Sequence, residues 1–569
     1  MTIASPGKIY TQDNFANSPL QIIQSIADKI INDTQFEFVP QFQETQLGVQ
    51  IIDFKREFAG NIKGICYALS YIGSGSDSIV NLGISASPGI SIWINDQILE
   101  VKKSERPSIK EIAYGMINFE DTLEVMIKKG FNKILIKSSP GHSFSKIFLR
   151  QITDNPETEG WLKFSVHPAL VNTGTSGWLI IGPLAGQSEE IPEKEIKNFY
   201  VNNGNYLTWR SPKQNVIQQL KINPGNTFKK DSYADWNYAN GETILSILSV
   251  AEETANEKYL SFAKQWCDFI LDNIGYFRWQ YDSLNALRGS FHRIFRKSML
   301  DDAGAPVLPF LQFYLDKKDE RYYSIIEEMS SYIMNKQVRF DDGTLCRPEP
   351  VEMTVWADDL FMAVPVLIRM RNITGDKKYF EEAVRQIISF NKKLFDEKKN
   401  LYKHGWFSKT GETSIAFWGR ANGWIIWALS EALLHLPKNL KEYSEIMTIY
   451  KSLVDGLIKY QDKSGMWHQV LDHPESYEET SCTAMFVLGI ARGVNNKWLN
   501  ESYSDYALKG WNALTKKIEP EGIVHGICRG TGIGENLEFY FNRPTFDNDP
   551  RGLGAVLTAG IEVSKLQAK

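Results

Sequence analysis

The chain has 569 residues, a length that predicts about two to four domains and a large hydrophobic core. Lys and Arg total 63 against 68 for Asp and Glu, which gives a net charge of −5. Because no block of basic residues could follow a phosphate backbone, we expect neither nucleic acid nor a membrane as a partner. Aromatic residues make up 12% of the chain, and their rings suit stacking on flat ligands as well as core packing.

The sequence lacks the patterns typical of metal and redox sites. Its cysteines are scattered, odd in number and never at C-x-x-C spacing, and no H-E-x-x-H, H-x-H or acidic calcium loop occurs. We therefore expect no metal and no cofactor. The first residues lack a basic segment followed by an apolar run, and no stretch of about 18 uncharged apolar residues occurs. This predicts a cytoplasmic protein, or a periplasmic one if a signal peptide preceded the given sequence.

Residues 1–185 have the pattern of β-strands. "SIVNLGISASPGISIWINDQILEVKK" alternates apolar and polar residues, and "GWLIIGPLAG" is a short β-rich run. We predict an all-β sandwich that serves as an accessory domain, followed by a polar linker at 186–200. "SIWINDQILEV" and "GFNKILIKSS" resemble jelly-roll modules attached to carbohydrate-active enzymes. A spacer without a ligand and a sugar-binding module are both compatible with this pattern.

Residues 201–569 have the pattern of long helices that repeat about every 60 residues. "KYLSFAKQWCDFI", "RYYSIIEEMSSYI" and "KYFEEAVRQIISF" share a Tyr in second place, and the third shows one apolar face, which is typical of outer helices. Between them, "DDLFMAVPVLIRM", "ANGWIIWALSEALL" and "TSCTAMFVLGIARGV" are apolar or small nearly all round, so other elements must cover them on every side. We predict an all-α (α/α)6 barrel that forms the catalytic domain.

Each predicted inner helix begins with a small or polar cluster, and all these clusters fall at the same end of the ring. Asp358 alone could be a helix cap, but capping does not explain polar starts that converge with tryptophans on one funnel. We predict a site at this mouth with Asp302 and Asp358 as catalytic acids. The predicted substrate-binding residues, from the same helix starts and the loops before them, are Trp236, Arg347, Trp356, His404, Trp418, Arg420, Trp424 and His468.

Several segments in this order resemble the unsaturated uronyl hydrolases, chiefly glycoside hydrolase family 105 (unsaturated rhamnogalacturonyl hydrolases) and more distantly family 88. They are "VWADDLFMAVPV", "LYKHGWF", "FWGRANGWIIWAL", "GMWHQVLD", "SYEETSCTAMFVLGIARGV" and "NRPTFDNDPRGLGAVL". The resemblance implies an exo-acting enzyme that removes the 4,5-unsaturated uronic acid left at a chain end by a polysaccharide lyase. It also implies that Asp358 protonates C4 of the sugar, while Asp302 holds sugar hydroxyls. Asp359 is expected to serve packing or capping. The sequence departs from the family at "DDAGAP" and at Arg551, where a His is common.

Three other functions remain as alternatives. A conventional inverting glycosidase would use Asp302 and Asp358 as acid and base on a saturated uronide. A non-catalytic protein would use the mouth to bind sugar, and a sugar epimerase would place a His pair at C2. The sequence does not identify the polysaccharide that supplies the substrate, which could be rhamnogalacturonan, ulvan or a glycosaminoglycan, and it does not predict the oligomeric state.

Overall fold

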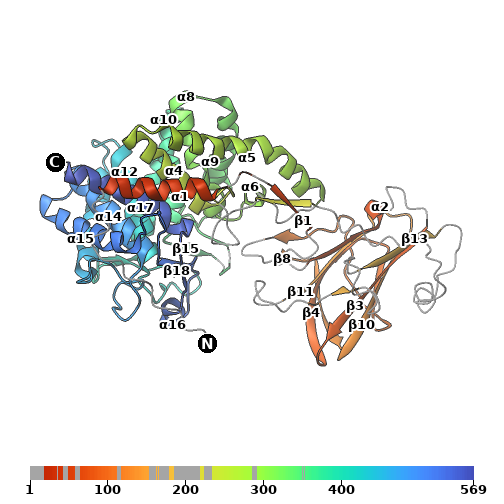
Figure 1. The fold of residues 1–569 in the computed structure, drawn as a ribbon. Coiled ribbons are helices and arrows are strands. Elements are labelled where there is room, and N and C mark those ends of the chain that lie inside the picture. Colours follow the sequence, from red (N-terminus) through yellow and green to blue (C-terminus); the bar gives the residue numbers. More distant parts are fainter. Residues whose placement is uncertain are drawn as a thin grey trace. The chain divides into compact units, whose positions relative to one another are not determined.

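The computed structural model describes residues 18–34, 36, 38–42, 49–57, 64–111, 117–152, 162, 164–165, 178–184, 218–222, 233–284, 291–348, 350–351 and 353–568. The chain forms two compact units (Figure 1). One unit comprises Met1–Val39, Ile222–Arg278 and Ser290–Lys569, and the other comprises Pro40–Lys221 and Trp279–Gly289. No helix in the described part of the chain is long and apolar enough to cross a lipid bilayer.

A ring of inner helices forms the centre of the first unit. Each helix contacts the next one in chain order, and the last contacts the first, which closes the ring. The inner helices are buried on nearly all sides, as their lack of a polar face predicts; in α12 every residue from 419 to 433 is buried. These helices are α4 (Tyr238–Thr254), α8 (Leu308–Lys317), α10 (Asp359–Thr374), α12 (Gly419–His435), α14 (Thr480–Asn495) and α17 (Pro550–Gln567).

Amphipathic outer helices cover this ring. In α11, for example, Ala383, Ile387 and Phe390 are buried, whereas Glu381 and Arg385 on the opposite face are exposed. Each outer helix packs on an inner one, so the predicted helical barrel is the observed architecture. The outer helices are α1 (Pro19–Asp33), α5 (Glu257–Leu284), α9 (Glu320–Asn335), α11 (Lys378–Leu394), α13 (Tyr443–Leu457) and α15 (Ser504–Leu514).

Helix α1 belongs to the barrel although it precedes the β-rich region in the sequence. It starts with a capping box formed by Ser18 and Gln21, and it buries an isoleucine-rich face against α17 and α4 (Figure 1, red). A Cβ atom on Gly560 of α17 would lie 2.3 Å from the Ile23 Cγ2 atom, so the two helices approach closely because residue 560 is a glycine. The structure therefore differs from the predicted boundaries, which placed all of residues 1–185 in the β-domain.

The second unit contains two antiparallel sheets with a common hydrophobic core. Ile84 of β4 and Ile147 of β11 come from one sheet and pack with Ala68 of β3 and Ile136 of β10 from the other. An antiparallel β-rich unit was predicted and is confirmed; the finer jelly-roll assignment stays a prediction. One sheet consists of β2 (Gln50–Asp53), β11 (Lys146–Ile152), β4 (Ser78–Ala86) and β9 (Asp121–Ile127). The other consists of β12 (Phe164–Ser165), β3 (Ile65–Ser74), β10 (Gly130–Ser138), β5 (Ile90–Ile94), β6 (Gln97–Ile98) and β13 (Leu179–Leu184).

The second unit is an insertion in the chain of the first. The chain leaves the barrel unit in β1 (Phe38–Phe42) and returns in β14 (Gln218–Ile222), and these two strands pair with each other. An insertion whose ends lie side by side can be accommodated with little change in the host domain. The predicted linker at 186–200 lies outside the described residues.

Candidate active site

The first turns of the inner helices meet at one mouth of the barrel. Arg420 of α12 donates to the Ser481 hydroxyl of α14 at 3.3 Å. Across the ring, Tyr238 at the start of α4 contacts Trp424 of α12, with ring centroids 6.1 Å apart. The helix starts that the sequence marks as polar are therefore in contact with one another.

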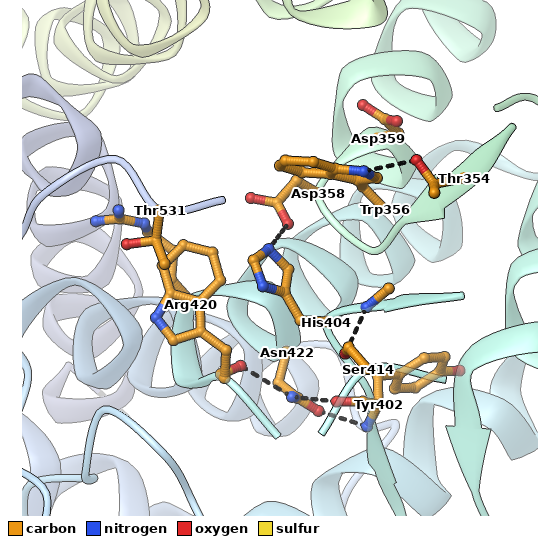
Figure 2. Close-up of polar contacts among 12 residues, drawn as sticks. Thr354, Trp356, Asp358, Asp359, Tyr402, His404, Ser414, Arg420, Asn422 and Thr531 are labelled. Carbon is orange, nitrogen blue, oxygen red and sulfur yellow. Dashed lines mark hydrogen bonds and ion pairs between the residues drawn. The ribbon is translucent and has the colours of Figure 1, made fainter. Parts of the chain in front are cut away.

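Asp358 stands directly before α10 at this mouth. Its backbone is already helical and its side chain makes no capping hydrogen bond, so Asp358 is not a cap. The short strand β15 (Thr354–Trp356) leads into it and pairs with β18 (Gly405–Phe407), which brings His404 beside it. His404 Nε2 lies 3.5 Å from Asp358 Oδ2, and Figure 2 shows the two side chains facing each other.

Three polar atoms here have no hydrogen-bond partner among the described residues. They are Asp358 Oδ2, His404 Nε2 and Trp418 Nε1, all inaccessible to water although the Asp358 side chain as a whole stays 16% exposed. The Trp418 ring lies against the imidazole of His404, with centroids 4.5 Å apart. Buried polar groups are normally paired, and exceptions often mark a function. These atoms mark the surroundings of Asp358 as a candidate functional site.

Arg347 connects two buried carboxylates beside Asp358. Its Nε and Nη2 atoms donate to Asp359 at 2.9 and 2.6 Å, and Nη2 also donates to Asp301 at 2.9 Å. The guanidinium lies 4.3 Å from the centroid of Trp356. Burial raises the pKa of Asp359 to about 6 and also raises the pKa of Asp301, although Arg347 opposes both shifts. Two carboxylates that share one cation out of water favour holding one proton between them. Figure 2 shows Asp359 on the side away from His404.

Asp302 has a different environment from its neighbour Asp301. The Ser298 backbone N–H donates to Asp302 at 2.9 Å, and Arg293 and Arg296 form ion pairs with it at 3.1 and 3.4 Å. Burial raises the pKa of Asp302, but the two arginines outweigh burial and the net shift is downward. Asp358 is among the charges that raise the pKa of Asp301. The short helix α7 (Leu300–Ala303) thus carries two adjacent carboxylates, one bound by Arg347 and the other by Arg293 and Arg296.

Arg420 is fully buried, and both of its terminal nitrogens donate hydrogen bonds. They bind the carbonyl oxygens of Cys528 and Arg529 at 2.5 and 2.7 Å, in addition to the Ser481 hydroxyl. The guanidinium therefore anchors the segment that begins at residue 528. The sequence suggested a contact with substrate, which stays a prediction; the anchoring role is visible only in the structure.

The predicted tryptophans contribute to the wall of the mouth. Trp356 Nε1 donates to the Thr354 hydroxyl at 2.9 Å, and Trp236 Nε1 donates to the Asp302 carbonyl at 2.8 Å. Trp424 stacks on a second tryptophan of α12, with centroids 5.8 Å apart. Trp418 Nε1 is buried and has no hydrogen-bond partner in the described chain.

His468 lies outside the contacts around Asp358. Its Nδ1 atom is 2.6 Å from the Ser476 carbonyl oxygen, which requires a proton on Nδ1. Nε2 lies 3.6 Å from Asp462 Oδ2 and has no hydrogen-bond partner among the described residues. This nitrogen can therefore accept a hydrogen bond from a ligand.

Sequence reasoning missed three residues of the site. Tyr238 is half-buried, with Arg551, Arg420, Asp301 and Asp358 as its charged neighbours, and desolvation raises its pKa. The motif "DWNYAN" before α4 was a usable signal for it, because it stands where other inner helices carry acids. Asp301 was passed over for its neighbour, and Tyr540, whose hydroxyl lies 2.9 Å from His404 Nδ1, lies in a segment without periodicity.

Comparisons with known proteins place this site in a family. Residues 213–567 match the model of Glycosyl Hydrolase Family 88. Unsaturated rhamnogalacturonyl hydrolase YesR of Bacillus subtilis (strain 168) is 29% identical over 349 residues, which cover 60% of this chain and 93% of that protein. An unsaturated 3S-rhamnoglycuronyl hydrolase of Alteromonas sp. (strain LOR) is 31% identical over 216 residues, 37% of this chain and 50% of that protein. A solved family 105 glycoside hydrolase of C. acetobutylicum ATCC 824 is 26% identical, with a TM-score of 0.52 over 59% of this chain and 96% of its own.

The helical barrel is similar in fold to this solved glycoside hydrolase. The family model matches more than half of the chain. The chain belongs to glycosyl hydrolase family 88 and is a glycoside hydrolase. The resemblance predicted from its motifs, to unsaturated uronyl hydrolases of families 105 and 88, is confirmed.

Proposed function

We propose that this enzyme removes a 4,5-unsaturated uronic acid from the non-reducing end of lyase-generated oligosaccharides by hydrating the C4–C5 double bond. One observation carries the proposal: Asp358 stands at the mouth of the barrel with an unpartnered oxygen facing His404 and no capping role. A partly exposed carboxyl that is not a cap and forms no short hydrogen bond is available to transfer a proton. The relatives named above act on unsaturated glycuronyl substrates, which supports the same substrate class here.

In the proposed reaction one carboxyl transfers protons and a second carboxyl holds hydroxyl groups of the sugar. Asp358 donates a proton to C4, and its carboxylate then accepts a proton from the water that adds to C5. The resulting C5 hemiketal opens its ring, the hemiacetal left at C1 collapses, and the remaining oligosaccharide leaves as an alcohol. We assign the second carboxyl to Asp301 in place of Asp302, because Asp302 is already bound by two arginines and a backbone N–H.

Other groups at the mouth would hold the sugar. Trp418 Nε1 offers an unpartnered donor to hydroxyl or carboxylate groups of a substrate, and His468 Nε2 offers an unpartnered acceptor to its hydroxyl groups. Tyr238, with Arg551 among its charged neighbours, contacts Trp424 at the mouth. Because two of the relatives are named for rhamnose-linked substrates, we propose an unsaturated uronic acid linked to rhamnose as the first substrate to test.

Incubation with a panel of lyase-generated disaccharides tests the proposal. Loss of the ultraviolet absorbance of the double bond reports turnover, and the reaction in D₂O should place deuterium at C4 of the released sugar. A saturated uronide of the same linkage is the control and should stay intact. Cleavage of the saturated compound without deuterium at C4 would instead identify a conventional glycosidase. Bound but unchanged ligand would identify a sugar-binding protein.

A further inference from the structure

The segment from Cys528 to Phe546 contains a residue that contacts the proposed catalytic apparatus from behind. Tyr540, in the short helix α16 (Leu537–Phe541), is fully buried, and its hydroxyl lies 2.9 Å from His404 Nδ1. The backbone N–H of Gly534 donates to the same hydroxyl at 3.0 Å. His404 Nε2 in turn faces Asp358 Oδ2 at 3.5 Å. These contacts form a line from Gly534 through Tyr540 and His404 to Asp358.

We propose that Tyr540 is a positioning residue whose hydroxyl fixes His404 in the tautomer that carries its proton on Nε2. A backbone N–H can only donate, so the Tyr540 oxygen accepts from Gly534. The hydroxyl proton then has one acceptor within reach among the described residues, which is His404 Nδ1. A neutral imidazole that accepts at Nδ1 carries its proton on Nε2. This N–H points at Asp358.

The tautomer distinguishes the two oxygens of Asp358. Oδ2 faces a donor and serves as an acceptor, so the proton that Asp358 delivers resides on Oδ1. After proton transfer, the Nε2–H stabilises the new carboxylate through a charge-assisted hydrogen bond. The 3.5 Å separation is longer than a formed hydrogen bond, and contacts of this kind tighten in the substrate complex.

The chain holds Tyr540 in place from several sides. Asn536 caps α16 by accepting from the Phe539 N–H at 2.9 Å. A Cβ atom on Gly534 would lie 2.2 Å from the Phe539 ring, so only a glycine leaves room for this turn. Ile533 packs where a side chain on Gly405 would lie, next to His404 in sequence. The hydroxyl position is therefore set by packing and does not depend on the hydrogen bond alone.

Solution NMR of the wild-type enzyme tests the tautomer without any substrate. The inference rests on the proposed function for its catalytic meaning, whereas the tautomer itself does not. In protein labelled with ¹⁵N in its histidine rings, two-bond ¹H–¹⁵N correlations distinguish the two neutral forms, and the signal missing from His404→Gln assigns the residue. We expect the Nε2–H form, with Nδ1 accepting a hydrogen bond. An Nδ1–H form in the wild-type enzyme would overturn the proposal even if the enzyme is fully active.

Tyr540→Phe tests the effect on the reaction. We expect kcat to fall by about 10-fold to 100-fold, the range seen when outer partners that orient a reacting group are lost, with KM changed by less than about 3-fold. The His404 Nδ1 signal should move downfield because its donor is gone. Tyr450→Phe is the matched control: the Tyr450 hydroxyl is also buried and donates to the Gly489 carbonyl at 2.7 Å, on an outer helix. This control should show a similar loss of melting temperature and an unchanged kcat.

A double variant separates positioning from general destabilisation. In His404→Gln, Tyr540 has no imidazole to orient, so adding Tyr540→Phe should lower kcat by less than about 2-fold further. Additive losses, or a Tyr540→Phe enzyme as active as Tyr450→Phe, would overturn the inference. If the wild-type enzyme leaves every unsaturated substrate intact, the proposed function fails, and the NMR result still decides the tautomer.

Discussion

The two ends of the barrel differ in whether their buried charged side chains have partners. At the end remote from the mouth, Arg492 binds Glu562 and Glu431 at 2.8 and 2.9 Å, and Arg369 binds the other Glu431 oxygen at 3.0 Å. Asn495 occupies the second Glu562 oxygen, so each carboxylate oxygen there has a partner. At the mouth, by contrast, Asp358 and its neighbours leave polar atoms unpartnered within the described chain.

Glu431 and Asp359, buried carboxyls at the two ends, also differ in the direction of their pKa shifts. Burial alone would raise the pKa of Glu431, but Arg369 and Arg492 lower it to about 2. At the mouth, burial outweighs Arg347 and raises the pKa of Asp359 to about 6. The paired charges at the remote end stabilise the fold. Those buried carboxyls at the mouth whose pKa values are raised are available for chemistry.

Both ends depend on an inner ring that outer helices cover, so removing one outer helix should have the largest effect. A chain that starts at residue 218 lacks α1 and exposes the surface that its four buried isoleucines cover. At about 1.5 to 3 kcal/mol for each isoleucine, this loss rivals the whole stability of a typical domain. We expect no cooperative thermal transition by circular dichroism.

The control for the chain without α1 is a chain in which a short glycine-containing turn replaces residues 43–217. This turn joins the paired strands β1 and β14, and the chain keeps α1. This chain should unfold cooperatively. Equal melting temperatures for the two chains would show that α1 is dispensable.

Asp358→Asn should have the next largest effect and should act on rate alone. The amide keeps the size of the side chain but cannot cycle a proton, so turnover should fall by about 10²-fold to 10⁴-fold. Because Asp358 makes no cap and no strong ion pair, the melting temperature should not decrease. Steady-state kinetics together with calorimetry check both statements. Full activity of the variant would remove Asp358 from the reaction.

Glu431→Gln should show the reverse pattern. Removing one partner from a buried ion pair leaves Arg369 and Arg492 poorly compensated, and we expect a loss of about 3 to 5 kcal/mol in the free energy of unfolding. Turnover per folded molecule should stay within about 2-fold of wild type, since the residue lies at the remote end. Urea unfolding at neutral pH gives the measurement, and an unchanged midpoint would contradict the contrast drawn between the ends.

The smallest predicted effect is a pH slope from Asp359. An unfolded aspartate titrates near pH 4, whereas the folded pKa is about 6, so between these values the folded state binds more protons than the unfolded state. The free energy of unfolding should therefore decrease as pH rises through this window, by about 1 kcal/mol between pH 5 and 6, and then level off. Asp359→Asn cannot ionise and should abolish this slope. Glu431 titrates below this window, with the opposite sign, and does not interfere.

The sequence predicted the features that repeat and missed those that do not. Apolar periodicity identified the inner and outer helices, and the convergence of their polar starts identified Asp358. It could not assign α1, because the partner helix α17 lies at the other end of the chain. It could not show that Asp301 and Asp302 bind different arginines either, since those partners come together only in the fold. Tyr540 lies in an irregular segment, where composition says nothing about contacts.

The position of α1 also determines the order in which the barrel can assemble. The helix is synthesised before the inserted β-unit, yet its buried face is covered by α17, the last helix of a 569-residue chain. Its isoleucines stay without their partner until α17 has been synthesised, while the β-unit, which precedes α17 in the chain, can fold earlier as an independent body. Contacts between such distant segments carry a large loop-closure entropy, which the early folding of the insertion reduces by bringing β1 and β14 together. Once the insertion has folded, a shorter flexible stretch of chain separates α1 from α17.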